Sequence, residues 1–130
     1  MINIDISGSS YMSKIAIEII GYVDLPGTIS VIKKVTGKGI AEIKHCIEVQ
    51  LPVWEAILFY NNHNEVATGL ADIVKKLPAI GTQLAMYELE ESDDATNLTR
   101  YQDCIITGEM LMNMLAMHND EIDRQQDYNQ

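Results

Sequence analysis

The chain has 130 residues, of which 47% are hydrophobic and 22% are charged, so it is long enough to bury the core of one domain. Its formal net charge of −10 disfavours binding to nucleic acid or to an anionic membrane, and no apolar run is long enough to span a bilayer. Residues 1–14 lack both a basic leader and a continuous apolar segment, so we expect no secretory signal. Cys46 and Cys104 do not have the spacing of a metal site, and we expect free thiols in a cytoplasmic protein.

The acidic residues are concentrated in the last third of the chain. Residues 1–87 carry eight acids against seven lysines, a net charge of −1, whereas residues 88–130 carry eleven acids against two arginines, a net charge of −9. A field of this sign steers basic partners toward the protein. The alternative is that the acidic segment only keeps the protein soluble.

The first predicted elements are a strand and a short helix. Residues 14–23 are rich in isoleucine and valine, which indicates a buried strand. The sequence DLPG at 24–27 predicts a turn, because proline fixes φ and glycine relaxes it. The apolar spacing of residues 28–35 then predicts a short helix that packs on the core.

A glycine turn separates that helix from a second one. We expect Gly37 to end the first helix in the left-handed conformation and the second helix to begin near Gly39. A phosphate-binding loop does not fit, because Ile40 stands where that motif requires serine or threonine. The second helix should end before Pro52, and its apolar stripe consists of Ile40, Ile43, Cys46 and Ile47.

The middle of the chain predicts two strands around a helix. Residues 53–60 (VWEAILFY) are apolar at nearly every position, which indicates a central strand covered on both faces, with Trp54 and Tyr60 as core residues. Residues 66–77 show the spacing of a third helix, and Pro78 should break it. Residues 80–89 predict the last strand.

The C-terminal third predicts a polar linker and a long helix. Residues 90–99 are polar, and residues 101–122 carry the apolar spacing of a helix despite Gly108. Methionines crowd this helix and make its apolar surface wide. A wide surface indicates contact with the domain body on one side and with a partner or a second copy, as a homodimer, on the other.

Together these elements predict an α+β fold. The order is β-α-α-β-α-β, with the helices on one face of a three-stranded sheet and an acidic C-terminal helix added. Residues 1–89 would form this α+β domain, and residues 90–130 would form the acidic linker and the helix that packs on the domain or extends it.

The helix–glycine turn–helix segment carries a family resemblance. Residues 29–36 read ISVIKKVT, and residues 37–44 read GKGIAEIK, with Glu48 four residues later. This pattern resembles the C-terminal domain of the bacterial ribosomal stalk protein, where I-K-x-V-R-x-x-T leads into T-G-L-G-L-x-E-A-K-x-x-V-E. The resemblance extends loosely over residues 14–89 and implies the same fold and a protein-binding, non-enzymatic role.

The resemblance also suggests a binding surface. In the stalk family the two short helices dock translational GTPases through lysines and an arginine. Lys33 stands at the arginine position and Lys44 at a family lysine, whereas Ser30 replaces an expected lysine and Lys38 replaces a leucine. An adaptor that hands N-degron substrates to a bacterial AAA+ protease is similar in its order of elements, but its Asn-Asp-Asp motif is missing here.

We find no convergent set of catalytic residues in the sequence, and we expect neither a cofactor nor a metal. His45 and Cys46 are adjacent on a predicted helix, so their side chains point about 100° apart and do not face each other as a base and a nucleophile would. A hydrolase that uses Cys46 or Cys104 is disfavoured, because a reactive thiol needs an electropositive setting.

We therefore expect a non-enzymatic protein-binding module of the inhibitor or immunity-protein type, whose acidic part neutralises or regulates a basic protein partner. The residues expected on that acidic face are Asp93, Asp94, Asp103, Glu109, Asp120 and Asp123. The alternative is a docking module for a translational GTPase, which would bind through Lys33, Lys38 and Lys44 of the short-helix face.

Overall fold

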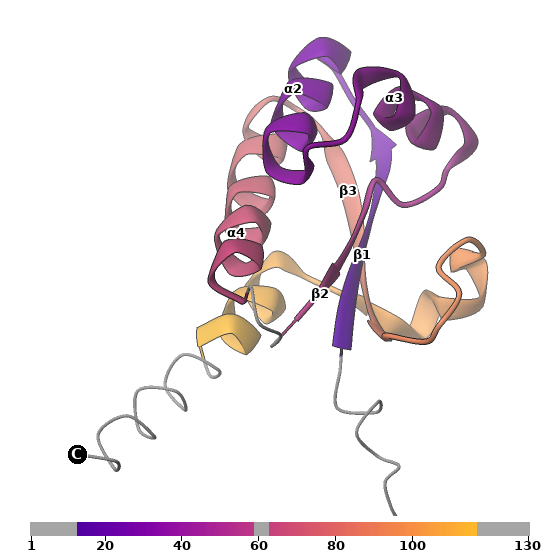
Figure 1. Cartoon of the computed structure of the whole chain (residues 1–130), viewed down its shortest axis with the longest axis vertical. Coiled ribbons are helices and arrows are strands. Elements are labelled where there is room, and N and C mark those ends of the chain that lie inside the picture. The colour runs from indigo at the N-terminus through magenta and orange to yellow at the C-terminus, as the bar shows by residue number, and fades with distance from the viewer. Residues whose placement is uncertain (1–12, 59–62, 117–130) are drawn as a thin grey trace, which may run out of the picture.

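The computed structural model describes residues 13–58 and 63–116, which form a mixed α+β structure around one open antiparallel sheet (Figure 1). The helices are α2 (Leu25–Thr36), α3 (Ile40–Val49), α4 (His63–Ala79) and the 3-10 helix η2 (Leu98–Cys104), and residues 108–116 are also helical. The strands are β1 (Ser13–Gly21), β2 (Trp54–Ile57), β3 (Gln83–Glu90) and β4 (Ile105–Ile106), in the spatial order β2-β1-β3-β4.

Strand β1 lies between β2 and β3 and pairs antiparallel with both. Its side chains alternate between the two faces of the sheet, so Ile15 and Ile17 point one way and Ala16 points the other. In this register Ile17 lies opposite Trp54 of β2 and Met86 of β3. All three strands therefore contribute to one apolar face.

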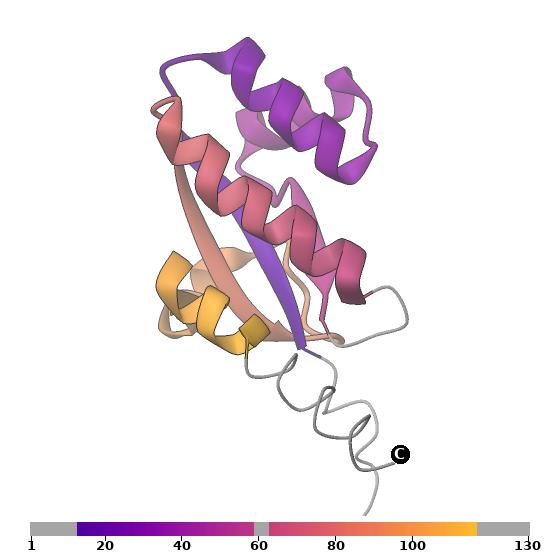
Figure 2. The ribbon, with the colours of Figure 1, turned by 90° about the vertical axis from the view of Figure 1, so that its left-hand side faces the viewer.

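Helices α2, α3 and α4 cover this apolar face, as predicted. Figure 2 shows α4 running along the sheet, with α2 and α3 grouped beyond one end of it. The helical segment 108–116 lies near the other end and adds Leu111 and Leu115 to the same core. The fully buried side chains at the centre of this core include Ile15, Ile17, Ile32, Ile43, Leu70, Ile73 and Leu77.

A smaller apolar cluster covers part of the opposite face. Tyr87 and Leu89 of β3 pack there with Ala16, and Ala95 and Leu98 of the following segment cover them. In Figure 1 this segment lies on the side of the sheet away from α4. The described part of residues 90–116 therefore packs on the body of the domain.

The predicted strand count was wrong, because the sheet has four strands among residues 13–58 and 63–116, and the fourth comes from the predicted long helix. Within 101–122, η2 ends at Cys104, Ile105 and Ile106 pair with Tyr87 and Met86, and the helix begins only at residue 108. The β-branched Ile105-Ile106 pair completes the edge of β3, and this tertiary pairing outweighs helix periodicity. Residues 117–122 lie outside the described residues.

The prediction of a central strand at 53–60 was also wrong. Of the described residues 53–58, only 54–57 are extended in the sheet, and β2 is an edge strand of the sheet that the described residues form. The run is apolar because Val53 and Leu58, which flank the strand, are fully buried in the core. Trp54 is half-buried against that core, and Tyr60 lies outside the described residues.

The sequence DLPG starts a helix and does not form a separate turn. Asp24 is the N-cap of α2, and its Oδ1 accepts a hydrogen bond from the Gly27 N–H at 3.0 Å. Pro26 falls in the first turn, where a missing N–H costs nothing. The C-terminal end agrees with the prediction, because Gly37 closes α2 with a left-handed φ of 76°.

Candidate docking groove between α2 and α3

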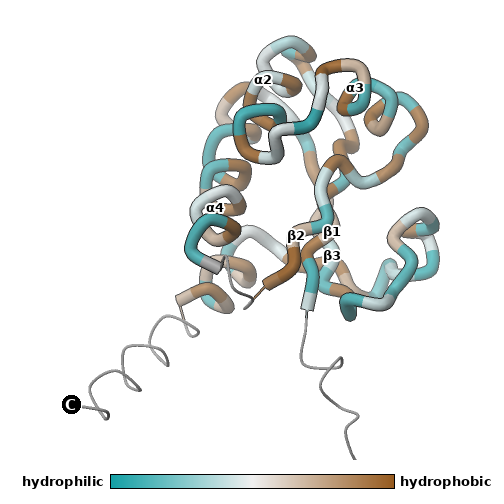
Figure 3. The backbone as a smooth tube through the Cα atoms, viewed as in Figure 1, coloured by the Kyte–Doolittle hydropathy of each residue, from teal (hydrophilic) through white to brown (hydrophobic). Residues whose placement is uncertain are grey.

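The outer surface of the α2–α3 pair contains a groove of about 480 Å³. Hydrophobic and hydrophilic positions alternate along both helices (Figure 3). The groove is apolar along its walls, with one hydroxyl and two ammonium groups beside them. The residues that line it are Leu25, Pro26, Ile29, Ser30, Lys33, Ile40 and Lys44.

Helix α2 supplies one wall of this groove. Its two caps and its buried side chains hold it on the body of the domain. Its N-cap and its glycine C-cap define both ends, and Ile32 is fully buried against the core. Ile29 is nearly buried, whereas Ser30 and Lys33 are exposed one turn apart along the same surface. The groove wall is therefore held by residues that also belong to the core.

Helix α3 supplies the other wall. Ile43 and Cys46 are buried and hold the helix on the body, which turns the opposite side of α3 outward. Ile40 and Lys44 lie four residues apart and are therefore neighbours on that outward side. Ile40 is 55% exposed, which leaves its apolar surface free to contact another molecule beside the groove.

The two groove lysines differ in what they do for the fold. Lys33 lies in the last turn of α2, where a positive charge also stabilises the helix dipole. Lys44 lies in the interior of α3 and has no such role. Within residues 13–58 and 63–116, neither lysine forms an ion pair. Both charges therefore face solvent beside an apolar floor.

Lys38 is held away from the groove. Its Nζ donates a hydrogen bond to the Val53 carbonyl at 2.9 Å, and its backbone N–H donates to Thr36 Oγ1 at 3.2 Å. These contacts tie the α2–α3 turn to the segment before β2. The structure thus brings together Lys33 and Lys44 but not the third predicted lysine.

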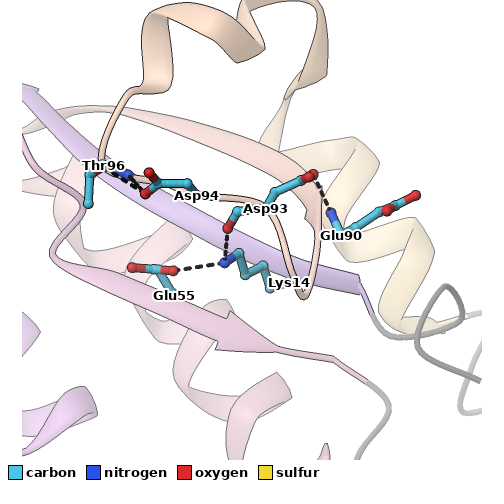
Figure 4. Close-up of polar contacts among 6 residues, drawn as sticks. All are labelled: Lys14, Glu55, Glu90, Asp93, Asp94 and Thr96. Atoms are coloured by element: carbon cyan, nitrogen blue, oxygen red, sulfur yellow. Dashed lines mark hydrogen bonds and ion pairs between the residues drawn. The ribbon is translucent and has the colours of Figure 1, made fainter.

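Two of the predicted acidic residues shape a turn after β3 (Figure 4). Asp93 Oδ2 accepts the Glu90 N–H at 2.9 Å, and Asp94 Oδ1 accepts both the hydroxyl and the N–H of Thr96, at 2.6 and 3.0 Å. The hydrogen bonds from Thr96, first its hydroxyl and then its N–H, lower the pKa of Asp94. These carboxylates are partly used by the local fold.

Lys14 fixes this turn to the sheet, and the sequence analysis did not single it out. Its side chain is only 8% exposed, and its Nζ donates to Glu55 Oε1 at 3.0 Å and to the carbonyl of Asp93 (Figure 4). Burying a lysine is costly unless it is paired, and both partners are acceptors. The position of Lys14 at the start of an isoleucine-rich strand could have indicated a buried, paired lysine.

The remaining predicted acidic residues lie on other elements or outside the described residues. Asp103 lies on η2 and Glu109 lies in the 108–116 helix, and both are exposed. Asp120 and Asp123 lie outside the described residues. Four of the six residues predicted for the acidic face therefore lie among the described residues, in the turn after β3, on η2 and in the 108–116 helix.

The candidate reactive groups are also separate. His45 is exposed on α3 while Cys46 beside it is buried, and Cys104 is half-buried in the smaller cluster. Tyr87 donates a hydrogen bond to Glu18 at 3.1 Å. The pKa of its phenol is raised, mainly because the side chain is buried. Among the described residues there is no group of three or more potential metal ligands.

Comparisons with known proteins gave no relative for this chain. No family model, no curated protein and no solved structure matches it. Within the ranges 13–58 and 63–116, no helix combines the length and the apolar character needed to cross a membrane.

Proposed function

We propose that this protein is a non-enzymatic, cytoplasmic docking module whose α2–α3 groove binds an apolar side chain flanked by acidic groups on a protein partner. The observation that carries the proposal is the groove itself, in which Leu25, Ile29 and Ile40 form apolar walls next to Lys33 and Lys44. The stalk-domain resemblance supports the same surface, and it suggests a translational GTPase as the partner.

The groove would bind a partner through one apolar contact and two ion pairs, which contribute different amounts to the binding free energy. One aliphatic side chain buried in the groove contributes about 1.5–3 kcal/mol. Ion pairs to exposed lysines each contribute less than about 1 kcal/mol, but they steer the encounter and disfavour basic partners. The apolar contact would therefore supply affinity, and the two lysines would supply specificity and association rate.

Charge reversal in the groove tests this proposal. The Lys33→Glu, Lys44→Glu double variant should weaken binding to a purified translational GTPase of the elongation-factor class by at least about tenfold, which corresponds to about 1.4 kcal/mol. Binding would be measured by isothermal titration calorimetry at low salt. Amide chemical-shift changes in the protein should cluster around Ser30 and Ile40.

The matched control reverses two other exposed lysines, Lys34 and Lys75, which do not line the groove. This control has the same net charge as the groove variant and should bind within about twofold of the unaltered protein, since only general electrostatics change. Equal loss in both variants would mean that total charge, and not the groove, determines binding.

A second candidate function keeps the acidic surface as an inhibitor-type binding site for a basic protein. One observation favours it: within residues 88–116 of the described chain, no acidic side chain forms an ion pair. Asp103 and Glu109, both exposed, would then contact the partner, while Asp93 and Asp94 would mainly maintain the turn. Electrostatic steering would dominate its association rate.

A further inference from the structure

The sequence that follows the last described helix has the chemistry that the groove would select. Residues 120–123 read Asp-Glu-Ile-Asp, which places one isoleucine among three carboxylates. The groove offers apolar walls with Lys33 and Lys44 beside them. We propose that Asp120–Asp123 of one copy occupies the α2–α3 groove of a second copy and so competes with the partner, an inference that rests on the proposed function.

The position of the 108–116 helix explains why a second copy is needed. The α2–α3 pair that forms the groove lies near the C-terminal end of β1, whereas the helical segment 108–116 lies near the N-terminal end of that strand (Figures 1 and 2). Nine residues of β1 span about 30 Å. The seven residues from 117 to 123 reach at most about 25 Å when fully extended. The end of the groove at Leu25 and Pro26, which follow the C-terminal end of β1, is therefore out of reach of the acidic segment of its own chain.

The start of the 108–116 helix is fixed, which keeps this separation. A Cβ atom built at Gly108 would lie 2.9 Å from Val74 Cγ1 of α4, so the backbone of the helix packs closely there. Leu111 and Leu115 are buried in the main core. Shifting the helix toward the groove would expose these leucines, and docking in the same chain is disfavoured.

Two copies arranged antiparallel could exchange these segments reciprocally. Each copy would supply one groove and one acidic segment, so the assembly closes as a two-fold dimer without exposed contacts of the same kind. Each single contact is small, but the first contact raises the effective concentration for the second. We expect a dimer with a Kd on the order of 0.1 mM that weakens as salt rises.

Complementation between two full-length variants tests this inference. The Lys33→Glu, Lys44→Glu protein retains the acidic segment but loses the groove charges, and the Ile122→Ser protein retains the groove but loses the apolar side chain. Each alone should be monomeric by sedimentation velocity at about three times the expected Kd. A mixture keeps one intact contact without the reciprocal one, so it should form a one-to-one complex only at concentrations about ten times higher, which a chemical-shift titration would detect. Circular dichroism would verify that both variants are folded.

The controls are the Lys34→Glu, Lys75→Glu protein and the Met117→Ser protein, which alter charge or apolarity outside the contact. Both should dimerise as the unaltered protein does. The inference is overturned if the unaltered protein stays monomeric at about three times the expected Kd, if the Ile122→Ser protein still dimerises there, or if the two variants fail to associate when mixed at about ten times that concentration.

The same variants separate this inference from the proposed function. If the groove variant loses elongation-factor binding and the unaltered protein is monomeric, the proposed function is supported and the self-association is refuted. If the protein dimerises through the groove but does not bind the elongation factor, the self-association is supported and the proposed function is refuted. If both hold, Ile122→Ser should bind the elongation factor more tightly at concentrations where the unaltered protein is dimeric.

Discussion

Two buried threonines, Thr28 of α2 and Thr82 just before β3, show how a polar contact can be directional. Their hydroxyl oxygens lie 2.6 Å apart, and Thr28 Oγ1 is also 2.8 Å from the Asp24 carbonyl. A hydroxyl has one hydrogen to donate, and the Asp24 carbonyl can only accept. Thr28 therefore donates to Asp24, and Thr82 donates to Thr28.

This direction predicts unequal costs for two similar substitutions. Thr28→Val removes both hydrogen bonds and leaves the buried Thr82 hydroxyl without an acceptor, so it should lower the free energy of unfolding by about 2 kcal/mol. Thr82→Val leaves the Thr28 donor satisfied and should cost about 1 kcal/mol. Urea denaturation would measure both. Equal costs, or the reverse order, would mean that the hydrogen bonds run in the other direction.

The sequence predicted only those groove residues whose positions follow from the helix pattern. Lys33 and Lys44 lie on the two short helices that the sequence predicts, and both were expected at a binding surface. The capture of Lys38 by the Val53 carbonyl depends on a contact across fifteen residues, which no local pattern reveals. The apolar groove floor was likewise missed, because Ile29 and Ile40 have the spacing of core residues.

At the scale of elements, Gly69 allows α4 to approach α2 and β2 closely. A Cβ atom built at this position would lie 2.7 Å from Val35 Cγ1 and 3.0 Å from Trp54 Cη2. Glycine in a helix interior normally costs about 1 kcal/mol relative to alanine. Close packing between these elements therefore outweighs helix propensity at this position.

This packing makes a prediction opposite to helix propensity. Gly69→Ala should lower the free energy of unfolding by about 1 kcal/mol, because overpacking costs about 1–3 kcal/mol and the propensity gain returns about 1. In a Val35→Ala background the first clash is removed, and Gly69→Ala should become nearly neutral. Thermal unfolding of the four proteins in this cycle would measure the coupling. An unchanged cost in the Val35→Ala background would contradict the assigned contact.

The order of the first six elements was predictable, but the edges of the sheet were not. Periodicity located β1, α2, α3, α4 and β3 because each has one buried face. For β2, the apolar run reflects burial of the flanking residues Val53 and Leu58 and is no evidence of a central position. For β4, only the free edge of β3 turns Ile105-Ile106 into a strand, and that edge exists only after folding.

For the whole molecule, the uneven charge gives the acidic surface a testable role. Asp103→Asn with Glu109→Gln should slow association with poly-lysine by about two- to fivefold at low ionic strength. Glu42→Gln with Glu48→Gln on α3 makes the same change in net charge and should slow it less, if the acidic surface binds locally. Stopped-flow fluorescence would measure both rates. The difference should vanish near 1 M salt, where the Debye length is about 3 Å; equal slowing by both pairs would argue against a local acidic surface.

The central position of β1 also has a consequence during synthesis. Its isoleucine-rich face is made first, but its two partner strands follow later in the chain, and β3 ends only at Glu90. At about 5–20 residues per second, the ribosome needs roughly 3–14 s to add the residues between β1 and the end of β3. During that interval the nascent strand is a hydrophobic segment without a sheet, which is the type of sequence that chaperones bind.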